Sequence, residues 1–257
     1  MDYQSLFDLK GLNAIVVGGG AGIGEGVCNG YADFGANVAV VDLNLEDAEK
    51  VSKGLIQKGV KSAAFQCDVT DPDEVRNVVR QVVDIFGSID ILFNSAGIGM
   101  RHKAEDMPEE VFDKVMKVNL YGTFHFCREV GQQMIKLGLG GKIINMASIS
   151  AHVGIPETVN YCASKGGVVA FSRCLATEWA EHNINVNTIS PSHIRTAMIQ
   201  RVMDKDPTKE AFFRENILLD RLGEVKDVVG SAIFLAASAG DFITGTTLIV
   251  DGGHSAR

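Results

Sequence analysis

A short apolar run that ends in a cluster of glycines constrains the fold of this chain more than any other feature. Residues 14–17 have the length and apolarity of a buried strand, and Gly18 follows at once. Residues 25–34 then place apolar side chains at helical spacing. Strand, glycine turn and helix in this order are typical of a dinucleotide-binding unit, because the turn and the helix N-terminus can approach a pyrophosphate. A glycine-rich turn without a ligand is the alternative.

We expect the glycine turn to supply several contacts to such a cofactor. Gly18 permits the tight turn after the strand, and Gly22 and Gly24 let the backbone and the helix start come close to the pyrophosphate. The expected contact residues of the turn are Gly18, Gly20, Gly22, Ile23 and Gly24.

A second apolar strand, residues 37–42, ends in the carboxylate of Asp42. Asp42 lies 18 residues after Gly24, close to the usual position of an acid that binds ribose hydroxyls. A carboxylate there repels the 2′-phosphate of NADP, and neither Leu43 nor Asn44 offers a compensating cation. The sequence therefore predicts NAD as the cofactor, with Asp42 and Leu43 in its site. Asp42 could instead only cap the next helix, although Asn44 can also serve as that cap.

Strand and helix signals alternate along the chain without a linker between them. The alternation predicts an α/β fold, a single domain over residues 1–257 in which a doubly wound parallel sheet carries helices on both faces. We expect strands at 13–17, 37–42, 62–67, 89–93, 141–146, 184–190 and 246–250. Helices are expected at 22–34, 45–58, 72–86, 108–137, 158–181 and 224–238. Residues 195–220 are the only long interruption, and their position predicts a mobile lid over a substrate.

Composition argues against several other classes of protein. The net charge of −8, without a basic cluster, disfavours a surface for nucleic acid or for an anionic membrane. No apolar stretch is long enough to span a bilayer, and no signal-peptide pattern stands at the start. The 5 cysteines show no paired spacing, so we expect reduced thiols and a cytoplasmic protein. The 6 histidines show no ligand spacing, so no metal is expected.

Tyr161 and Lys165 lie four residues apart, and Ser148 precedes the tyrosine by thirteen residues. On a helix, positions i and i+4 share a face, so the phenol and the ammonium would point into the same space. Ionising a tyrosine at pH 7 costs about 4 kcal/mol. A cation ~5 Å away supplies roughly 3 kcal/mol at an effective dielectric near 20. The pair could therefore act as an acid or base at neutral pH; a packed tyrosine one turn from a solvated lysine is the alternative.

Taken together, the motifs resemble the short-chain dehydrogenase/reductase family over essentially the full length of the chain. The motifs that carry the resemblance are Gly18-x-x-x-Gly22-Ile23-Gly24, Asp68-Val69, Asn94-Ser95-Ala96-Gly97, Asn119, Ser148, Tyr161-x-x-x-Lys165, Pro191-Ser192-His193-Ile194-Arg195-Thr196 and Val250-Asp251-Gly252-Gly253. The resemblance implies an enzyme that transfers hydride between a nicotinamide dinucleotide and an alcohol or carbonyl compound. It also implies cofactor contacts at Asp68 and Val69 (adenine), Asn94 (adenosine ribose), Ala96, Gly97, Pro191, Ile194 and Thr196, the last two around the nicotinamide.

The same resemblance implies four catalytic residues. Tyr161 would exchange a proton with the substrate oxygen, and Ser148 would donate a hydrogen bond to that oxygen. Lys165 would act on Tyr161 and also reach the nicotinamide ribose, and Asn119 would hold a water that relays protons. Two other serines, at positions 150 and 164, are rivals of Ser148, but a spacing of thirteen residues before the tyrosine is the common one in the family.

The substrate is expected to meet the segment 98–103, which follows a strand and so lies at the mouth of the pocket. Arg101 of this segment could bind a carboxylate through two hydrogen bonds; an arginine solvated on a loop is the alternative. The segment is similar to gluconate 5-dehydrogenase and related polyol dehydrogenases, so we expect a polyol, a sugar or a sugar acid. His152 and His193 are expected to add polar contacts to the substrate.

Two other functions and one assembly are compatible with the same motifs. A 3-oxoacyl-acyl-carrier-protein reductase shares them but typically prefers NADPH and an acidic partner, which Asp42 and the acidic composition disfavour. A dinucleotide-sensing protein without turnover would be expected to have lost part of the Ser-Tyr-Lys set, which is complete here. The family is usually a homotetramer, built here through residues 108–137 and 158–181. An amphipathic helix buried within one chain would have the same pattern.

Overall fold

One parallel sheet organises the molecule. The computed structural model describes residues 2–256, apart from the side chain of Met198. Within these residues, seven strands pair in the order β3-β2-β1-β4-β5-β6-β7, all parallel. They are β1 (Asn13–Val17), β2 (Asn37–Asp42), β3 (Ser62–Gln66), β4 (Ile91–Asn94), β5 (Gly141–Met146), β6 (Ile184–Pro191) and β7 (Thr247–Val250). The strand order reverses between β1 and β4, the point where doubly wound sheets bind their ligands.

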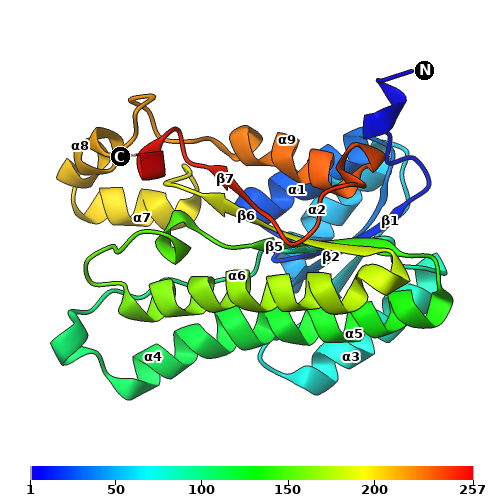
Figure 1. The fold of residues 1–257 in the computed structure, drawn as a ribbon, viewed down its shortest axis with the longest axis horizontal. Coiled ribbons are helices and arrows are strands. Elements are labelled where there is room, and N and C mark those ends of the chain that lie inside the picture. Colours follow the sequence, from blue (N-terminus) through cyan, green and yellow to red (C-terminus); the bar gives the residue numbers. More distant parts are fainter. Residues whose placement is uncertain (1, 257) are drawn as a thin grey trace.

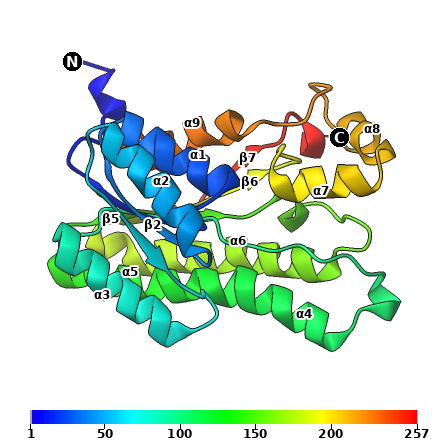
Figure 2. The same cartoon turned by 180° about the vertical axis from the view of Figure 1, so that it is seen from behind.

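Helices cover both faces of the sheet, so the molecule has three layers (Figure 1; Figure 2). One face carries α1 (Gly22–Asp33), α2 (Leu45–Gln57) and α9 (Val225–Ala236). The other carries α3 (Pro72–Phe86), α4 (Glu109–Met116), α5 (Gly122–Leu137) and α6 (Val159–Trp179). Two further helices, α7 (Ala197–Lys205) and α8 (Thr208–Glu215), project at one end, next to the C-terminus. The predicted α/β fold with a doubly wound parallel sheet is confirmed.

Alternate side chains of the strands fill an apolar core on each face. Val16 packs with Val27 and Tyr31 of α1, whereas its neighbour Ile15 packs with the α3 and α5 side. Since successive side chains of a strand point to opposite faces, a strand buried on both faces is a nearly continuous apolar run, here residues 14–17. The five residues of β1 are accordingly all buried.

Local capping explains where several helices begin. The Asn44 side chain accepts a hydrogen bond from the Glu46 N–H at the start of α2, which confirms Asn44 as the cap. At α3 the Asp71 side chain accepts from two N–H groups of the first turn, and Pro72 occupies the first helical position, where its missing N–H costs nothing.

The structure corrects the expected helix over residues 108–137. A π-helical turn, Lys117–Tyr121, separates α4 from α5, and the Gly122 N–H bonds to the Lys117 carbonyl five residues back. Apolar periodicity did not reveal it, since one extra residue shifts the phase of the apolar pattern but leaves each side helical. Such turns are frequent at functional sites, and this one contains Asn119.

Smaller corrections concern element bounds and the expected lid. The strand expected at 89–93 is Ile91–Asn94, and the interruption at 195–220 contains α7 and α8. Met203 of α7 and Phe213 of α8 form a small separate apolar cluster with Ile217 and Leu222, which follow α8. A separate cluster explains why the segment folds without contributing to the sheet.

The close approach of α1 to the glycine turn generates a prediction about stability. A Cβ added to Gly24 would lie 1.9 Å from the Gly18 carbonyl oxygen, a backbone atom that cannot move aside cheaply. We expect Gly24→Ala to lower the free energy of unfolding by about 1–3 kcal/mol or more, as overpacked cores do. Urea denaturation followed by circular dichroism measures it. Gly54→Ala in α2, where a Cβ meets nothing within 4 Å, is the matched control and should be neutral or stabilising; equal effects at both positions would contradict the packing argument.

Candidate active site

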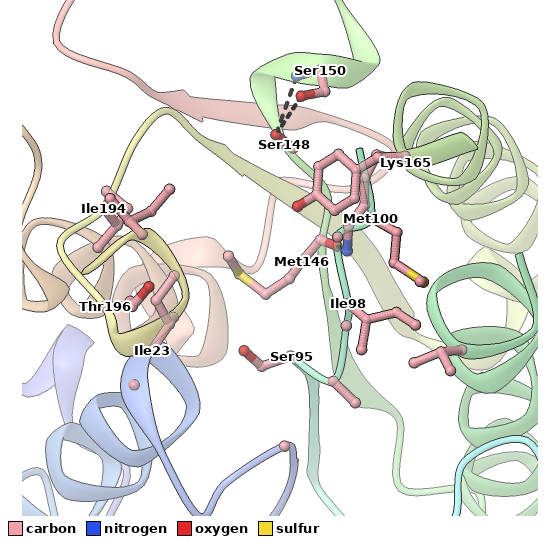
Figure 3. A pocket seen from close by; sticks show the side chains of 18 of the residues that line it. Ile23, Ser95, Ile98, Met100, Met146, Ser148, Ser150, Lys165, Ile194 and Thr196 are labelled. Carbon is pink, nitrogen blue, oxygen red and sulfur yellow. Dashed lines mark hydrogen bonds between the residues drawn. The ribbon is translucent and has the colours of Figure 1, made fainter. Parts of the chain in front are cut away.

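A cleft of about 1510 Å³ opens at the carboxyl ends of the strands. Its wall includes residues from the glycine turn, from the ends of β2, β4, β5 and β6, from α4, and from the segment that contains α7 and α8. Figure 3 shows how side chains from these separate segments face one space, with Ile23 and Thr196 on one side and Met100 and Lys165 on the other. The volume exceeds that of a pocket for a drug-sized molecule and suits a dinucleotide together with a small substrate.

The glycine turn has the geometry that a pyrophosphate requires. Gly18 and Gly22 have φ values of +73° and +58°, a region that side chains disfavour. A Cβ on Gly18 would lie 2.7 Å from the Ala96 N, so the turn also lies against the end of β4. Gly18, Gly22 and Ile23 line the cleft, at the N-terminus of α1. These residues fit a dinucleotide phosphate.

Two predicted contacts of the turn have other roles. Gly20 and Gly24 do not line the cleft. The Gly20 N–H donates to Asp42 Oδ2 at 2.9 Å, and Gly24 permits the packing of α1 on Gly18. Sequence spacing cannot separate a glycine needed for a ligand from one needed for close packing, because both positions only exclude a side chain.

Asp42 lies at the end of β2, on the wall of the cleft. Its Oδ2 accepts from Gly20 N and its Oδ1 from Asn44 N at 3.0 Å, so the carboxylate is held in one orientation. It forms no ion pair with any residue that the structure describes, and its neighbour Leu43 is 65% exposed on the same wall. An oriented carboxylate without a cation nearby suits two ribose hydroxyls.

Most other predicted cofactor residues also line this cleft. They are Asp68, Val69, Ala96, Gly97, Pro191, Ile194 and Thr196, together with Ser95, which the sequence analysis had left without a role. Asn94 is the exception. Its side chain is buried behind the wall and donates to Asn145 Oδ1 at 2.8 Å, while Asn94 Oδ1 has no partner among the described residues. The prediction that Asn94 lies by the adenosine ribose is therefore wrong for its side chain.

Ser148 and Tyr161 come together across the cleft from different elements. Ser148 follows β5 and Tyr161 lies in the first turn of α6. Burial raises the pKa of the Tyr161 hydroxyl, and a hydrogen bond with Ser148 acts in the opposite direction. The Ser148 hydroxyl also donates to Ser150 Oγ at 3.2 Å (Figure 3). Ser164 is fully buried and donates to the Tyr161 carbonyl at 2.8 Å, so it is part of the helix and not of the cleft.

Lys165 shares the cleft face of α6 with Tyr161, as the spacing predicts. Its Nζ lies 5.8 Å from the centroid of the Tyr161 ring and donates to the Met146 carbonyl at 2.7 Å. Burial lowers the pKa of Lys165 to about 8. The expectation that this ammonium lowers the pKa of Tyr161 is not met in the protein alone, where the effect of burial is larger and the pKa of Tyr161 rises.

Asn119 lies within the π-helical turn, fully buried behind the cleft wall. Its Oδ1 accepts from Ile98 N at 2.8 Å, and its Nδ2 donates to Ile98 O at 2.9 Å and to Ser164 Oγ at 3.2 Å. The side chain therefore connects three elements of the site: the segment after β4, α6 and the helix that contains Asn119.

The predicted substrate residues are divided between the cleft and its surroundings. Arg101 is exposed on the cleft wall and makes no hydrogen bond or ion pair with the residues that the structure describes. His193 also lines the cleft and stacks on Phe213 with ring centroids 4.1 Å apart. Burial, helped by His254 and Arg101, lowers the pKa of His193 to about 4, so the ring is neutral at pH 7. His152 bonds through Nε2 to Ser190 Oγ at 3.0 Å and lies just outside the cleft wall, so its contact with the substrate stays a prediction.

Comparison with known proteins agrees with this geometry. A protein-family model described as "Enoyl-(Acyl carrier protein) reductase" matches residues 18–255. D-threitol dehydrogenase of Mycolicibacterium smegmatis is 39% identical over 98% of this chain and 95% of its own length. NAD-dependent glycerol dehydrogenase of Listeria innocua is 37% identical, over 98% and 96%. The structure of a gluconate 5-dehydrogenase from Burkholderia cenocepacia, in complex with NADP and tartrate, has a TM-score of 0.95 at 31% identity over 100% of both chains.

The chain belongs to the short-chain dehydrogenase/reductase family. It is an oxidoreductase that acts on CH–OH groups and uses a nicotinamide dinucleotide. The resemblance found in the sequence is thereby confirmed. Within residues 2–256, no helix has the length and apolarity needed to cross a membrane, and no three His, Cys, Asp or Glu side chains are grouped as a metal would need.

The sequence analysis missed several residues of this dehydrogenase that shape the site. Met146 supplies the carbonyl that accepts from Lys165, and Phe213 stacks on His193. The Asn160 amide donates to the Met100 carbonyl and accepts from the Tyr161 N–H. The first two depend on contacts between distant segments, which no local pattern reports. Asn160 did carry a signal, since an asparagine at the start of a helix is a common capping residue.

The buried Lys165 generates a prediction about the pH dependence of stability. Between pH 8 and pH 10 the unfolded chain keeps this lysine protonated, whereas the folded protein releases the proton, so rising pH favours the folded state. The free energy of unfolding of the wild type relative to Lys165→Met should therefore increase by about 2–3 kcal/mol across this range, at ~1.36 kcal/mol per pH unit. Urea denaturation without cofactor at pH 7, 8, 9 and 10 measures it. Lys53→Met, at an exposed position of α2, should show no such trend; a pH-independent difference for Lys165→Met would contradict the prediction.

Proposed function

We propose that this enzyme oxidises a polyol, a sugar or a sugar acid with NAD, or reduces the corresponding ketone. One observation carries the proposal: the Ser148, Tyr161 and Lys165 side chains converge on a cleft whose wall also presents the unpaired guanidinium of Arg101. The three side chains suit proton transfer at a substrate oxygen, and the guanidinium suits a carboxylate or several hydroxyls of the same molecule.

In this scheme Tyr161 is the general acid and base. Its raised pKa keeps the hydroxyl protonated in the protein alone, so it is ready to donate to a carbonyl oxygen during reduction. Ser148 hydrogen-bonds the same oxygen and stabilises its charge. The bound nicotinamide supplies or accepts the hydride and, when oxidised, adds a positive charge. During alcohol oxidation, Lys165 favours the ionised form of Tyr161 by its own charge.

The role proposed for Asn119 is to hold a proton-relaying water through its backbone. Its side-chain amide is committed to Ile98 and Ser164. Its carbonyl already accepts from Thr123 Oγ1 at 2.7 Å, so the proposed water would bind beside this hydroxyl. Asn119 and Lys165 are neighbours, since a Cβ on Gly97 would be within 4 Å of both Asn119 Oδ1 and Lys165 Nζ, which supports a relay between the two residues.

The segment 195–220 is proposed to act as a substrate lid. Several of its residues line the cleft, among them Ile199, Val202 and Phe213. The segment leaves the body at Ile194 and returns at Gly223, where the two positions form a parallel bridge. Leu219 N also donates to Gly252 O after β7 at 3.1 Å, so the part proposed to move over the cleft lies before this second attachment.

Turnover tests the proposed chemistry. We expect reduction of NAD with at least one of D-gluconate, D-threitol or glycerol, and loss of this activity by a factor of ~10²–10⁴ in Tyr161→Phe. A screen at 340 nm, with hydroxy ketones and an acyl thioester included, measures both. Tyr3→Phe, which alters a tyrosine 70% exposed near the N-terminus, is the matched control. Full activity of Tyr161→Phe, or activity with the thioester alone, would overturn the proposal.

Asp42 supports NAD as the preferred cofactor, and the Listeria relative is named NAD-dependent, whereas the Burkholderia structure holds NADP. We expect kcat/KM for NAD to exceed that for NADP at least tenfold, because the carboxylate repels a 2′-phosphate. Asp42→Ala should reduce the preference about tenfold, and Asp84→Ala, at an exposed position of α3, should leave it unchanged. Steady-state kinetics with both cofactors measure this, and a wild type that prefers NADP would refute it.

We further propose a cytoplasmic homotetramer. Free cysteines support a reducing compartment. Exposed aromatic side chains on α5 and in the turn before it, Tyr121 and Phe124, and the fully exposed Phe242 before β7 support contacts with other copies of the chain.

A further inference from the structure

The segment that presents Arg101 is held at every second residue. Ile98 exchanges two hydrogen bonds with the Asn119 side chain. Met100 O accepts from Asn160 Nδ2 at 3.2 Å, and His102 N donates to Glu157 O at 3.0 Å. We call residues 98–102 the recognition arm. Figure 3 shows Ile98 and Met100 of the arm on the side of the pocket that also carries Lys165.

Asn160 differs from the other groups that hold the arm, because its amide also holds the catalytic helix. The residue is fully buried, and its Oδ1 accepts from Tyr161 N at 2.7 Å. The first N–H groups of a helix have no partner within the helix, and Thr158, which precedes α6, provides no side-chain cap. Asn160 thus satisfies the amide of Tyr161 with one end and the carbonyl of Met100 with the other.

The two hydrogen bonds of the Asn160 amide connect the backbone at Tyr161 with the backbone next to Arg101. Met100 immediately precedes Arg101, and a Cβ on Gly99 would lie 3.9 Å from the Tyr161 ring. The guanidinium itself has no partner among the described residues. Among the described residues, only the backbone of the arm therefore restrains the position of the guanidinium. The hydrogen bond from Asn160 to Met100 O is the restraint closest to Arg101 on its N-terminal side.

We propose that Asn160 is a positioning residue that sets the separation between the Tyr161 hydroxyl and the Arg101 guanidinium, and so selects anionic substrates whose reacting carbon lies at a fixed distance from their carboxylate. This inference rests on the proposed function. Asn160 touches neither the substrate nor the cofactor in this scheme; it acts through its bonds to the Tyr161 N–H and to the Met100 carbonyl, which precedes Arg101.

The kinetic test compares a sugar acid with an uncharged polyol. In Asn160→Ala we expect KM for D-gluconate to rise about tenfold with kcat within about twofold, and KM for D-threitol to change less than twofold. Asn160→Asp keeps the acceptor for the Tyr161 amide and loses the donor to Met100. If the alanine variant folds poorly, Asn160→Asp should show the same rise in KM for D-gluconate without a change in KM for D-threitol. Equal changes for both substrates would overturn the inference.

A double variant shows whether the effect passes through Arg101. Arg101→Met alone should raise KM for D-gluconate, and adding Asn160→Ala to it should change KM less than twofold further. Multiplicative effects of the two changes would contradict the proposal. Asn187→Ala is the matched control, because the Asn187 amide is equally buried and bonds at both ends, to Ile243 O and Thr246 N, away from the arm. Asn187→Ala should lower stability and leave the ratio of KM for D-gluconate to KM for D-threitol unchanged.

A readout without substrate separates this inference from the proposed function. Hydrogen exchange of the His102 amide, which bonds to Glu157 O, should accelerate at least tenfold in Asn160→Ala and remain unchanged in Asn187→Ala. If the wild type oxidises neither substrate, the proposed function fails while this measurement still decides whether Asn160 holds the arm. Unchanged exchange in Asn160→Ala would refute the positioning role even in an active enzyme.

Discussion

A hydrogen bond between a buried ammonium and a strand carbonyl holds the catalytic helix on the sheet. Lys165 Nζ donates to Met146 O at the end of β5, while Ser148 follows two residues later on the same strand end. Removing an ammonium from water is unfavourable, which is why burial lowers its pKa to about 8. A purely structural contact would be more stable if it were apolar. A charged group at this position is therefore explained by its proposed role in proton transfer. The same contact also fixes the position of Tyr161 relative to Ser148.

The parallel sheet explains why residues distant in sequence meet in one cleft. All strands end at the same edge, so the residues after β1, β2, β4, β5 and β6 are neighbours there whatever their separation along the chain. The two halves of the cleft are stabilised differently. The cofactor half consists of short turns fixed by glycines and by Asp42, whereas the substrate half consists of the recognition arm and the segment 195–220, which have few contacts with the sheet.

This difference also determines how much of the site could be predicted from the sequence. Gly18, Asp42, Ser148 and Tyr161 were predictable because turn geometry, strand ends and helical spacing are local properties. The side chain of Asn94 was misplaced, since a residue at the last position of a strand can point to the cleft or to the interior, and only the packing with Asn145 decides.

The π-helical turn and the burial of Lys165 also lay beyond local reasoning. Asn119 was identified as important, but its bonds to Ile98 depend on how α4 meets the end of β4. The pKa of Tyr161 was predicted to fall because the sequence reports the proximity of a cation and not the burial of both groups. Periodicity correctly predicted that residues 108–137 are helical. It wrongly predicted one continuous helix, since α4 and α5 are separated by the π-helical turn.

The parallel bridge between Ile194 and Gly223 has a consequence for how such an enzyme diversifies. The backbone enters and leaves at adjacent points, with Arg195 N bonded to Gly223 O and Gly223 N to His193 O. Residues between these points can be lengthened, shortened or replaced at little entropic cost to the remaining chain, because the closure of the loop is already made. Selection can then alter which alcohol is accepted while the dinucleotide half stays as it is, so a single scaffold can give rise to many specificities.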